Sequence, residues 1–229
     1  MGLFAPVWMT DKTKKIPKAV AAVKNMDDPE QLREVALHAK LVDIKLAACT
    51  KIDDPIILAE VATTSGSYIA KRLLKRLSGH NDLLKQVALK YAHDGELAAE
   101  AVDGMSAPRA ADLAEIRLAV TNAHCTWDTV RGRTKVYSDM TPMEQKAYTQ
   151  AKTQVSEAIG RAMEKITDRQ ELSAAIKTLC AYGWSVPGYS NLLDRLTPEQ
   201  LSSLAQEREV NQGVCSAARK KADHSLDSH

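Results

Sequence analysis

The segment IDDPIILAEVA, residues 52–62, decides the fold, because an earlier segment of the chain repeats it. Residues 26–36 read MDDPEQLREVA and share Asp-Asp-Pro, Leu, Glu, Val and Ala with residues 52–62 at the same relative positions. A third and looser copy continues the pattern over residues 77–88. A repeat of this length is typical of proteins that use one supersecondary unit many times over.

The Asp-Asp-Pro tripeptide predicts the start of a helix. Asp28 and Asp54 can accept hydrogen bonds from the unpaired N–H groups of the first helical turn. Pro29 and Pro55 then stand at the first helical position, where the missing N–H costs nothing. Apolar residues follow at the i, i+3, i+4 spacing of a helix. The side chains that this spacing predicts to be buried are Leu32, Val35, Ala36 and Ala39 in one copy, and Leu58, Val61 and Ala62 in the next.

Each repeat is therefore predicted to be a hairpin of two short helices. A lone hairpin cannot bury its apolar stripe, so we expect the copies to pack on one another. Capping boxes at Thr141 and Thr197 predict two further helix starts. The long stretch 141–166 is predicted to be one helix whose stripe begins at Met143 and Ala147 and continues to Ile166.

The run Asp43-Ile44-Lys45-Leu46-Ala47-Ala48 resembles the HEAT-repeat consensus of an acid, an aliphatic residue, a basic residue and paired alanines. The resemblance covers residues 17–92 and continues more loosely over 94–122 and 141–210. In the third copy Arg72 and Leu73 replace the alanine pair. The resemblance implies an all-α fold, an α-solenoid of stacked helical hairpins with a less regular helical C-terminal half. It implies an architecture and no particular activity.

The pattern divides the chain into five predicted parts. These are an N-terminal arm (1–16) whose Trp8 is expected to pack on the first helices, a HEAT-like array (17–122), an irregular connecting segment (123–140), a C-terminal helical region (141–212) and a polar tail (213–229) expected to be frayed.

Composition narrows the class of function. The 229 residues contain 31 basic and 29 acidic side chains, and 45% are hydrophobic. A protein that binds many phosphates normally has a basic surplus, so the charge balance weighs against nucleic acid as a partner. No apolar run is long enough for a transmembrane helix. The chain has four scattered cysteines without a Cys-x-x-Cys pair and no secretory signal pattern, which favours a cytoplasmic protein with free thiols and no metal or cofactor.

Two sets of residues are candidates for partner binding. The segment from His124 to Tyr137 interrupts the periodicity and contains Trp127, Arg131, Arg133 and Tyr137, residue types that concentrate binding energy at interfaces. The alternative is that its aromatic side chains fill the junction between the two helical halves. Glu34 and Glu60 occupy one repeat column, which is either a solvated face or part of a partner-binding groove.

The function that we expect is a non-catalytic helical-repeat scaffold that binds a protein or peptide. The competing hypothesis is a nucleic-acid-binding protein or a DNA glycosylase, because one family of alkylpurine glycosylases is built from HEAT-like repeats. Trp127, Asp128, Arg131 and Trp184 are superficially similar to the Trp, Asp and Arg residues of that family. The basic cluster over residues 71–76 is either a solvated helix face or a phosphate-binding patch.

Substitutions in residues 52–62 test the repeat. Asp54→Ala removes a helix cap and is expected to lower the free energy of unfolding by about 1 kcal/mol. Val61→Asp places an unpaired charge in the packed interface and is expected to be far more destabilising. Thermal melts of both variants check this, and equal effects would show that Val61 is not buried.

Overall fold

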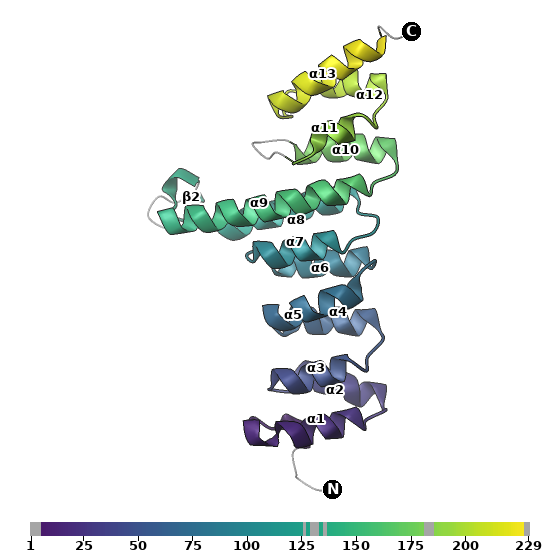
Figure 1. The fold of residues 1–229 in the computed structure, drawn as a ribbon. Helices are drawn as coiled ribbons and strands as arrows, with labels where there is room; N and C mark the ends of the chain where they lie inside the picture. Colours follow the sequence, from purple (N-terminus) through teal and green to yellow (C-terminus); the bar gives the residue numbers. More distant parts are fainter. Residues whose placement is uncertain (1–5, 126, 129–132, 135–136, 181–185, 227–229) are drawn as a thin grey trace. The chain divides into compact units, whose positions relative to one another are not determined.

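The computed structural model describes residues 6–125, 127–128, 133–134, 137–180 and 186–226 (Figure 1). Nearly all regular structure in these residues is helical, which confirms the prediction of an all-helical protein. The chain divides into two compact units, residues 1–87 and residues 88–229.

Unit 1 contains short helices joined by tight turns. Their bounds are η1 Val7–Met9, η2 Thr13–Lys15, α1 Ile16–Lys24, α2 Pro29–His38, α3 Val42–Cys49, α4 Pro55–Thr64, α5 Ser67–Leu74, η3 Lys75–Leu77 and α6 Asn81–Lys90, which crosses into unit 2. Helix α1 contacts α3, while α2 contacts both α3 and α4, and α4 contacts α5. The short helix η1 lies on α1 and α2 and buries Trp8, as predicted.

The predicted helix starts of unit 1 are confirmed. The carboxylate of Asp28 accepts a hydrogen bond from the backbone N–H of Glu30 at 3.0 Å, and that of Asp54 accepts one from Ile56 at 2.8 Å. The apolar side chains predicted to follow each cap are buried at 4% exposure or less. The repeated segment thus specifies both where its helix begins and which face of it is covered.

Unit 2 contains α-helices of 5 to 23 residues and a small strand pair. Their bounds are α7 Gly95–Asp103, α8 Ala110–His124, β1 Trp127–Asp128, β2 Arg133–Thr134, η4 Tyr137–Asp139, α9 Pro142–Glu164, α10 Arg169–Leu179, α11 Tyr189–Leu193, α12 Pro198–Ala205 and α13 Gln212–Leu226. Helix α7 contacts α9, α8 contacts α10, and α10 contacts α12, while α9 contacts α11 and α11 contacts α13. Both predicted capping boxes, at Thr141 and Thr197, are present.

Three expectations for residues 123–229 are corrected. The polar tail forms α13, which packs on α12 through Val214, Ala218 and Ala222, because alanine at i+4 spacing covers a helix without an obvious apolar stripe. Met143 is 80% exposed because the first turns of α9 lie outside the packed core. Part of the segment expected to be irregular is regular, because Trp127 and Asp128 pair with Thr134 and Arg133 in a two-residue antiparallel ladder.

A recurring interaction closes the ends of four helices. Just after a helix ends, a lysine or arginine side chain donates hydrogen bonds to carbonyl groups at the end of the helix two positions earlier and just beyond that end. The donors and acceptors are Lys51 with the carbonyls of Lys24 and Met26, Arg76 with Cys49 and Ile52, Lys165 with Asp103 and Met105, and Arg195 with Glu164 and Ile166. Carbonyl groups at a helix end have no partner within their own helix, so each basic residue supplies a donor there. The Cys49 carbonyl also accepts a hydrogen bond from the backbone N–H of Ile52 at 3.3 Å.

Arg76→Met tests this interaction in unit 1. The substitution keeps much of the aliphatic stem but removes the guanidinium donor from the carbonyls of Cys49 and Ile52. We expect the free energy of unfolding to fall by about 1–3 kcal/mol, since each lost bond is to a charged donor. Denaturant titration measures this, and Lys75→Met, which changes the adjacent exposed cation, is the matched control. Equal stability of the two variants would contradict a capping role for Arg76.

Candidate functional site

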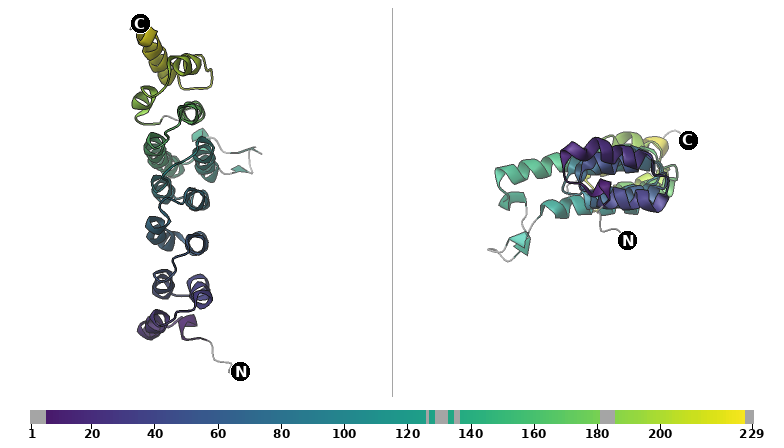
Figure 2. Two further views of the ribbon diagram at one scale, coloured as in Figure 1. Left: turned by 90° about the vertical axis from the view of Figure 1, so that its right-hand side faces the viewer. Right: turned by 90° about the horizontal axis from the view of Figure 1, so that it is seen from below.

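Helices α8 and α9 form an extended end within unit 2. Helix α8 has 15 residues and α9 has 23, whereas their neighbours α7 and α10 have 9 and 11. The two long helices run past α7 and α10 at the end that leads to β1 and β2 (Figures 1 and 2). We call this region, formed by the C-terminal turns of α8, η4 and the first half of α9, the α8–α9 end.

Large apolar side chains are exposed on these elements. Leu118 on α8 is 57% exposed, Tyr137 in η4 is 50% exposed and Met143 on α9 is 80% exposed. Within the described part of unit 2, these three are the large apolar side chains with such exposure. Exposed apolar side chains that form a contiguous patch mark interaction surfaces, whereas single scattered ones are normal on any protein.

An aromatic cluster fixes η4 against α9. The Tyr148 ring lies with its centroid 6.0 Å from Tyr137 and 5.8 Å from His124. The Tyr137 and Thr149 hydroxyls are hydrogen-bonded at 3.3 Å, and the Gln145 amide donates to the Tyr137 carbonyl at 3.1 Å. The residues that follow the connecting segment are therefore held on α9 by packing and by hydrogen bonds.

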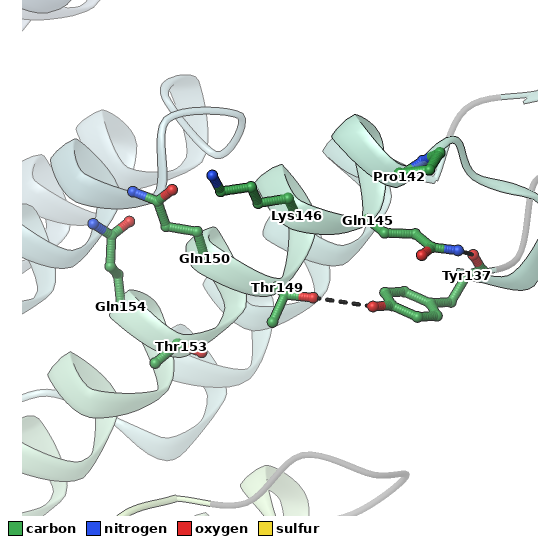
Figure 3. A pocket seen from close by; sticks show the side chains of 8 residues that line it. All are labelled: Tyr137, Pro142, Gln145, Lys146, Thr149, Gln150, Thr153 and Gln154. Carbon is green, nitrogen blue, oxygen red and sulfur yellow. Dashed lines mark hydrogen bonds between the residues drawn. The ribbon is translucent and has the colours of Figure 1, made fainter.

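A groove of about 550 Å³ follows the first half of α9 (Figure 3). It is lined by Tyr137, Pro142, Gln145, Lys146, Thr149, Gln150, Thr153 and Gln154. Lys146, Gln150 and Gln154 stand four residues apart and project in succession from the same side of the helix (Figure 3). Lys146 is the charged residue of this lining, and the rest are amide, hydroxyl or apolar groups.

A second recess of about 380 Å³ lies beside the groove and shares Gln150 and Gln154 with it. It is lined also by His93, Asp94, Gly95, Glu96, His124, Ala147 and Ala151. Gly95 is required there, because a Cβ atom on it would lie 2.4 Å from the Cα of Ala151. The close approach brings the first turn of α7, with its two carboxylates, against α9.

His124 has an unsatisfied polar atom in this recess. Its Nε2 is buried and has no hydrogen-bond partner within the described residues. Burial lowers the pKa of His124, and the nearby His93 lowers it further. The imidazole is therefore neutral near pH 7 and can accept or donate a hydrogen bond, depending on its tautomer.

The structure places the predicted site residues in different ways. Tyr137 belongs to the α8–α9 end, and the backbones of Trp127 and Arg133 lie in β1 and β2 beside it. Their side chains, and the whole of Arg131 and Trp184, lie outside the described residues.

The two glutamates of the repeat column differ in their surroundings. The carboxylate of Glu60 accepts hydrogen bonds from the Arg33 guanidinium at 2.9 to 3.3 Å. Glu34 is exposed and its carboxylate lies 3.9 Å from His38. Both belong to unit 1. In the basic cluster, Arg76 caps a helix and is not a freely solvated cation.

Sequence reasoning missed Lys146, Gln150 and Gln154. The sequence predicts that these three residues share one face of a long helix, because they are four residues apart. That spacing occurs on every helix and does not by itself indicate binding. His93 and His124 are far apart in sequence, and the packing of α7 on α9 brings both to one recess.

Comparisons with protein-family models, curated proteins and solved structures gave no match for this chain. No helix in the described part of the chain is both long and apolar enough to cross a membrane. Among those same residues, no three His, Cys, Asp or Glu side chains are arranged to hold a metal ion.

The lowered pKa of His124 predicts an acid-sensitive contribution to stability. The unfolded chain binds a proton at His124 more readily than the folded protein does, so folding is favoured above the unfolded pKa of about 6.5 and less favoured as pH falls through it. We expect His124→Gln to weaken the loss of unfolding free energy between pH 7 and pH 5. Denaturant titrations at several pH values measure it, with the exposed His38→Gln as control. An unchanged pH dependence in His124→Gln would contradict the burial of its imidazole.

Proposed function

We propose that this protein is a non-catalytic helical-repeat scaffold of the HEAT-like type, with its hairpins stacked as a solenoid, and that it binds a protein or peptide partner at the α8–α9 end. The observation that carries the proposal is the exposure of Leu118, Tyr137 and Met143 on helices that extend past their neighbours.

The repeat architecture is supported by three features. The capped helix starts recur at Asp28 and Asp54, and each unit has contacts between helices two positions apart in the chain. The basic caps recur with the same geometry in both units. Proteins built in this way present rigid surfaces on which a binding site can be placed.

A polypeptide partner is supported by the chemistry of the α8–α9 end. Large apolar side chains are exposed on its elements, and one of them, Tyr137, lines a groove with amide and hydroxyl groups, which is the mixture that protein interfaces use. The groove has one lysine, whereas a surface that engages nucleic acid neutralises several phosphates. The interface is expected to be centred on Met143 and Tyr137.

A double substitution tests the proposal. Leu118→Glu with Met143→Glu removes two exposed apolar side chains from the α8–α9 end. The control is Ile56→Glu, which removes an exposed apolar side chain from α4, where Ile56 is 67% exposed. Because all three side chains are on the surface, we expect each variant to keep its stability within about 0.5 kcal/mol.

Affinity capture from native lysate, with quantitative mass spectrometry, is the measurement. The wild type and Ile56→Glu are expected to recover the same partner, and the double variant is expected to recover at least tenfold less of it. Equal recovery by all three proteins would contradict binding at the α8–α9 end. Tight DNA binding that weakens steeply with salt would instead support the nucleic-acid hypothesis.

A further inference from the structure

We propose that unit 1 binds the surface of a membrane that contains anionic lipids, with Val7 and Met9 inserted among the lipid headgroups and Lys12, Lys15 and Lys18 beside the lipid phosphates. We call these five residues the η1–η2 surface. The inference goes beyond the proposed function, because it concerns a second surface and uses none of the residues of the α8–α9 end.

Two apolar side chains point outward from η1. A 3₁₀ helix has three residues per turn, so consecutive side chains point in directions about 120° apart. Trp8 is buried in unit 1, where η1 contacts α1 and α2. Its neighbours Val7 and Met9 are therefore directed away from the core, and they are 43% and 40% exposed. The buried indole thus fixes the position of two exposed apolar side chains.

Three lysines lie beside these apolar side chains. Lys12, Lys15 and Lys18 follow one another at intervals of three residues, which places them on one side of η2 and the start of α1. Together with the two apolar side chains they line a recess of about 330 Å³. The lining includes one carboxylate, that of Asp11. Charge complementarity therefore favours an anionic occupant.

The lysines are available to bind an anion. All three are exposed, and within the described residues their ammonium groups make no hydrogen bond and no ion pair. Residues 6–24 contain five lysines and a single acidic residue, Asp11, although the charge of the whole chain is nearly balanced. Lys51 in the same unit differs, because its ammonium group donates to two carbonyls and to the carboxylate of Asp27.

The stability of α1 does not account for these charges. Lys15 stands immediately before α1, and the first turn of the helix contains no acidic residue. The N-terminal end of a helix has a partial positive charge, so cations are unfavourable there and anions are favourable. Lys15 and Lys18 therefore repel the end of their own helix, and a lipid phosphate beside them would relieve that repulsion.

The combination of groups favours a lipid surface over other polyanions. Proteins that bind single-stranded nucleic acid stack aromatic side chains on the bases. Here the neighbouring aromatic side chain, that of Trp8, is buried, and the exposed apolar groups of Val7 and Met9 are not aromatic. Binding to a membrane interface increases both with the apolar area that is buried and with attraction to anionic lipids. The η1–η2 surface offers both kinds of contact in one place.

Sedimentation of the full chain with lipid vesicles tests the proposal. The protein is expected to bind vesicles of phosphatidylcholine and phosphatidylglycerol in equal parts, and to bind them less tightly as salt is raised. Vesicles of phosphatidylcholine alone are expected to bind at least tenfold more weakly, because each lysine near an anionic surface strengthens binding about fivefold. No binding to the mixed vesicles, or equal binding to both kinds, would overturn the proposal.

Substitution of the lysines tests which residues make the contact. Lys12→Gln with Lys15→Gln and Lys18→Gln is expected to weaken binding to the mixed vesicles about a hundredfold. The matched control, expected to bind as the wild type does, carries the same change at three exposed lysines elsewhere in the chain, namely Lys40, Lys75 and Lys220. Thermal melts check that both variants are folded. Equal vesicle binding by the two variants would contradict a contact at the η1–η2 surface.

Substitution of the apolar side chains distinguishes a membrane from another polyanion. Val7→Thr with Met9→Gln keeps the size of both side chains and is expected to weaken vesicle binding at least threefold. The same variant is expected to leave any binding to poly-glutamate or to a DNA duplex unchanged. If the wild type binds either polyanion more tightly than the mixed vesicles, and this variant binds the vesicles as the wild type does, the proposal is overturned.

The two proposals are tested separately. The Leu118→Glu, Met143→Glu variant keeps the η1–η2 surface and is expected to bind the mixed vesicles as the wild type does, whatever its effect on partner capture. Loss of vesicle binding in that variant would place the membrane contact at the α8–α9 end and would overturn this inference.

Discussion

The carbonyl groups at the end of a helix have no partners in their own helix, and this protein satisfies them from outside. Lys51, Arg76, Lys165 and Arg195 each stand just beyond a helix and donate to the last carbonyls of the helix two positions earlier. A charged donor binds a carbonyl more strongly than a neutral one does, and it also opposes the negative end of the helix dipole. The contact therefore joins the first helix of one hairpin to the first helix of the hairpin before it. It fixes which helix end lies at the contact, because hydrogen bonds are more directional than apolar packing.

The α8–α9 end follows from the lengths of its helices. The neighbours α7 and α10 have 9 and 11 residues, so the additional turns of α8 and α9 have less protein to pack against. Met143 is consequently exposed, although the pattern of α9 is amphipathic along its whole length. The close packing of Gly95 on Ala151 marks where coverage by α7 begins, and the two recesses share Gln150 and Gln154.

Local signals made the helices and much of the core predictable. Asp28, Asp54, Thr141 and Thr197 cap helices because each needs only the N–H groups of the next turn, which the sequence itself supplies. Helix α13 was not predicted, because its buried face consists largely of alanine and most of its other residues are polar.

The site could be predicted only in part, because its geometry depends on packing between distant segments. Tyr137 could be predicted as a candidate for partner binding, because tyrosine is one of the residue types that concentrate binding energy at interfaces. Whether Met143 is covered depends on the length of α7, and the meeting of His93 with His124 depends on how closely α7 approaches α9. The contacts of the basic caps could not be predicted either. A lysine or arginine that follows a helix can be solvated or can donate to a distant carbonyl, and the sequence pattern is the same in both cases.

The central claim is that a protein or peptide partner binds at the α8–α9 end. Amide hydrogen exchange of the full chain, with and without the partner recovered by affinity capture, tests this claim most directly. The account predicts slower exchange confined to the C-terminal turns of α8, η4 and the first half of α9, where the partner contacts the protein. Protection of the segment Pro55–Thr64 in unit 1, with no change along α9, would contradict it.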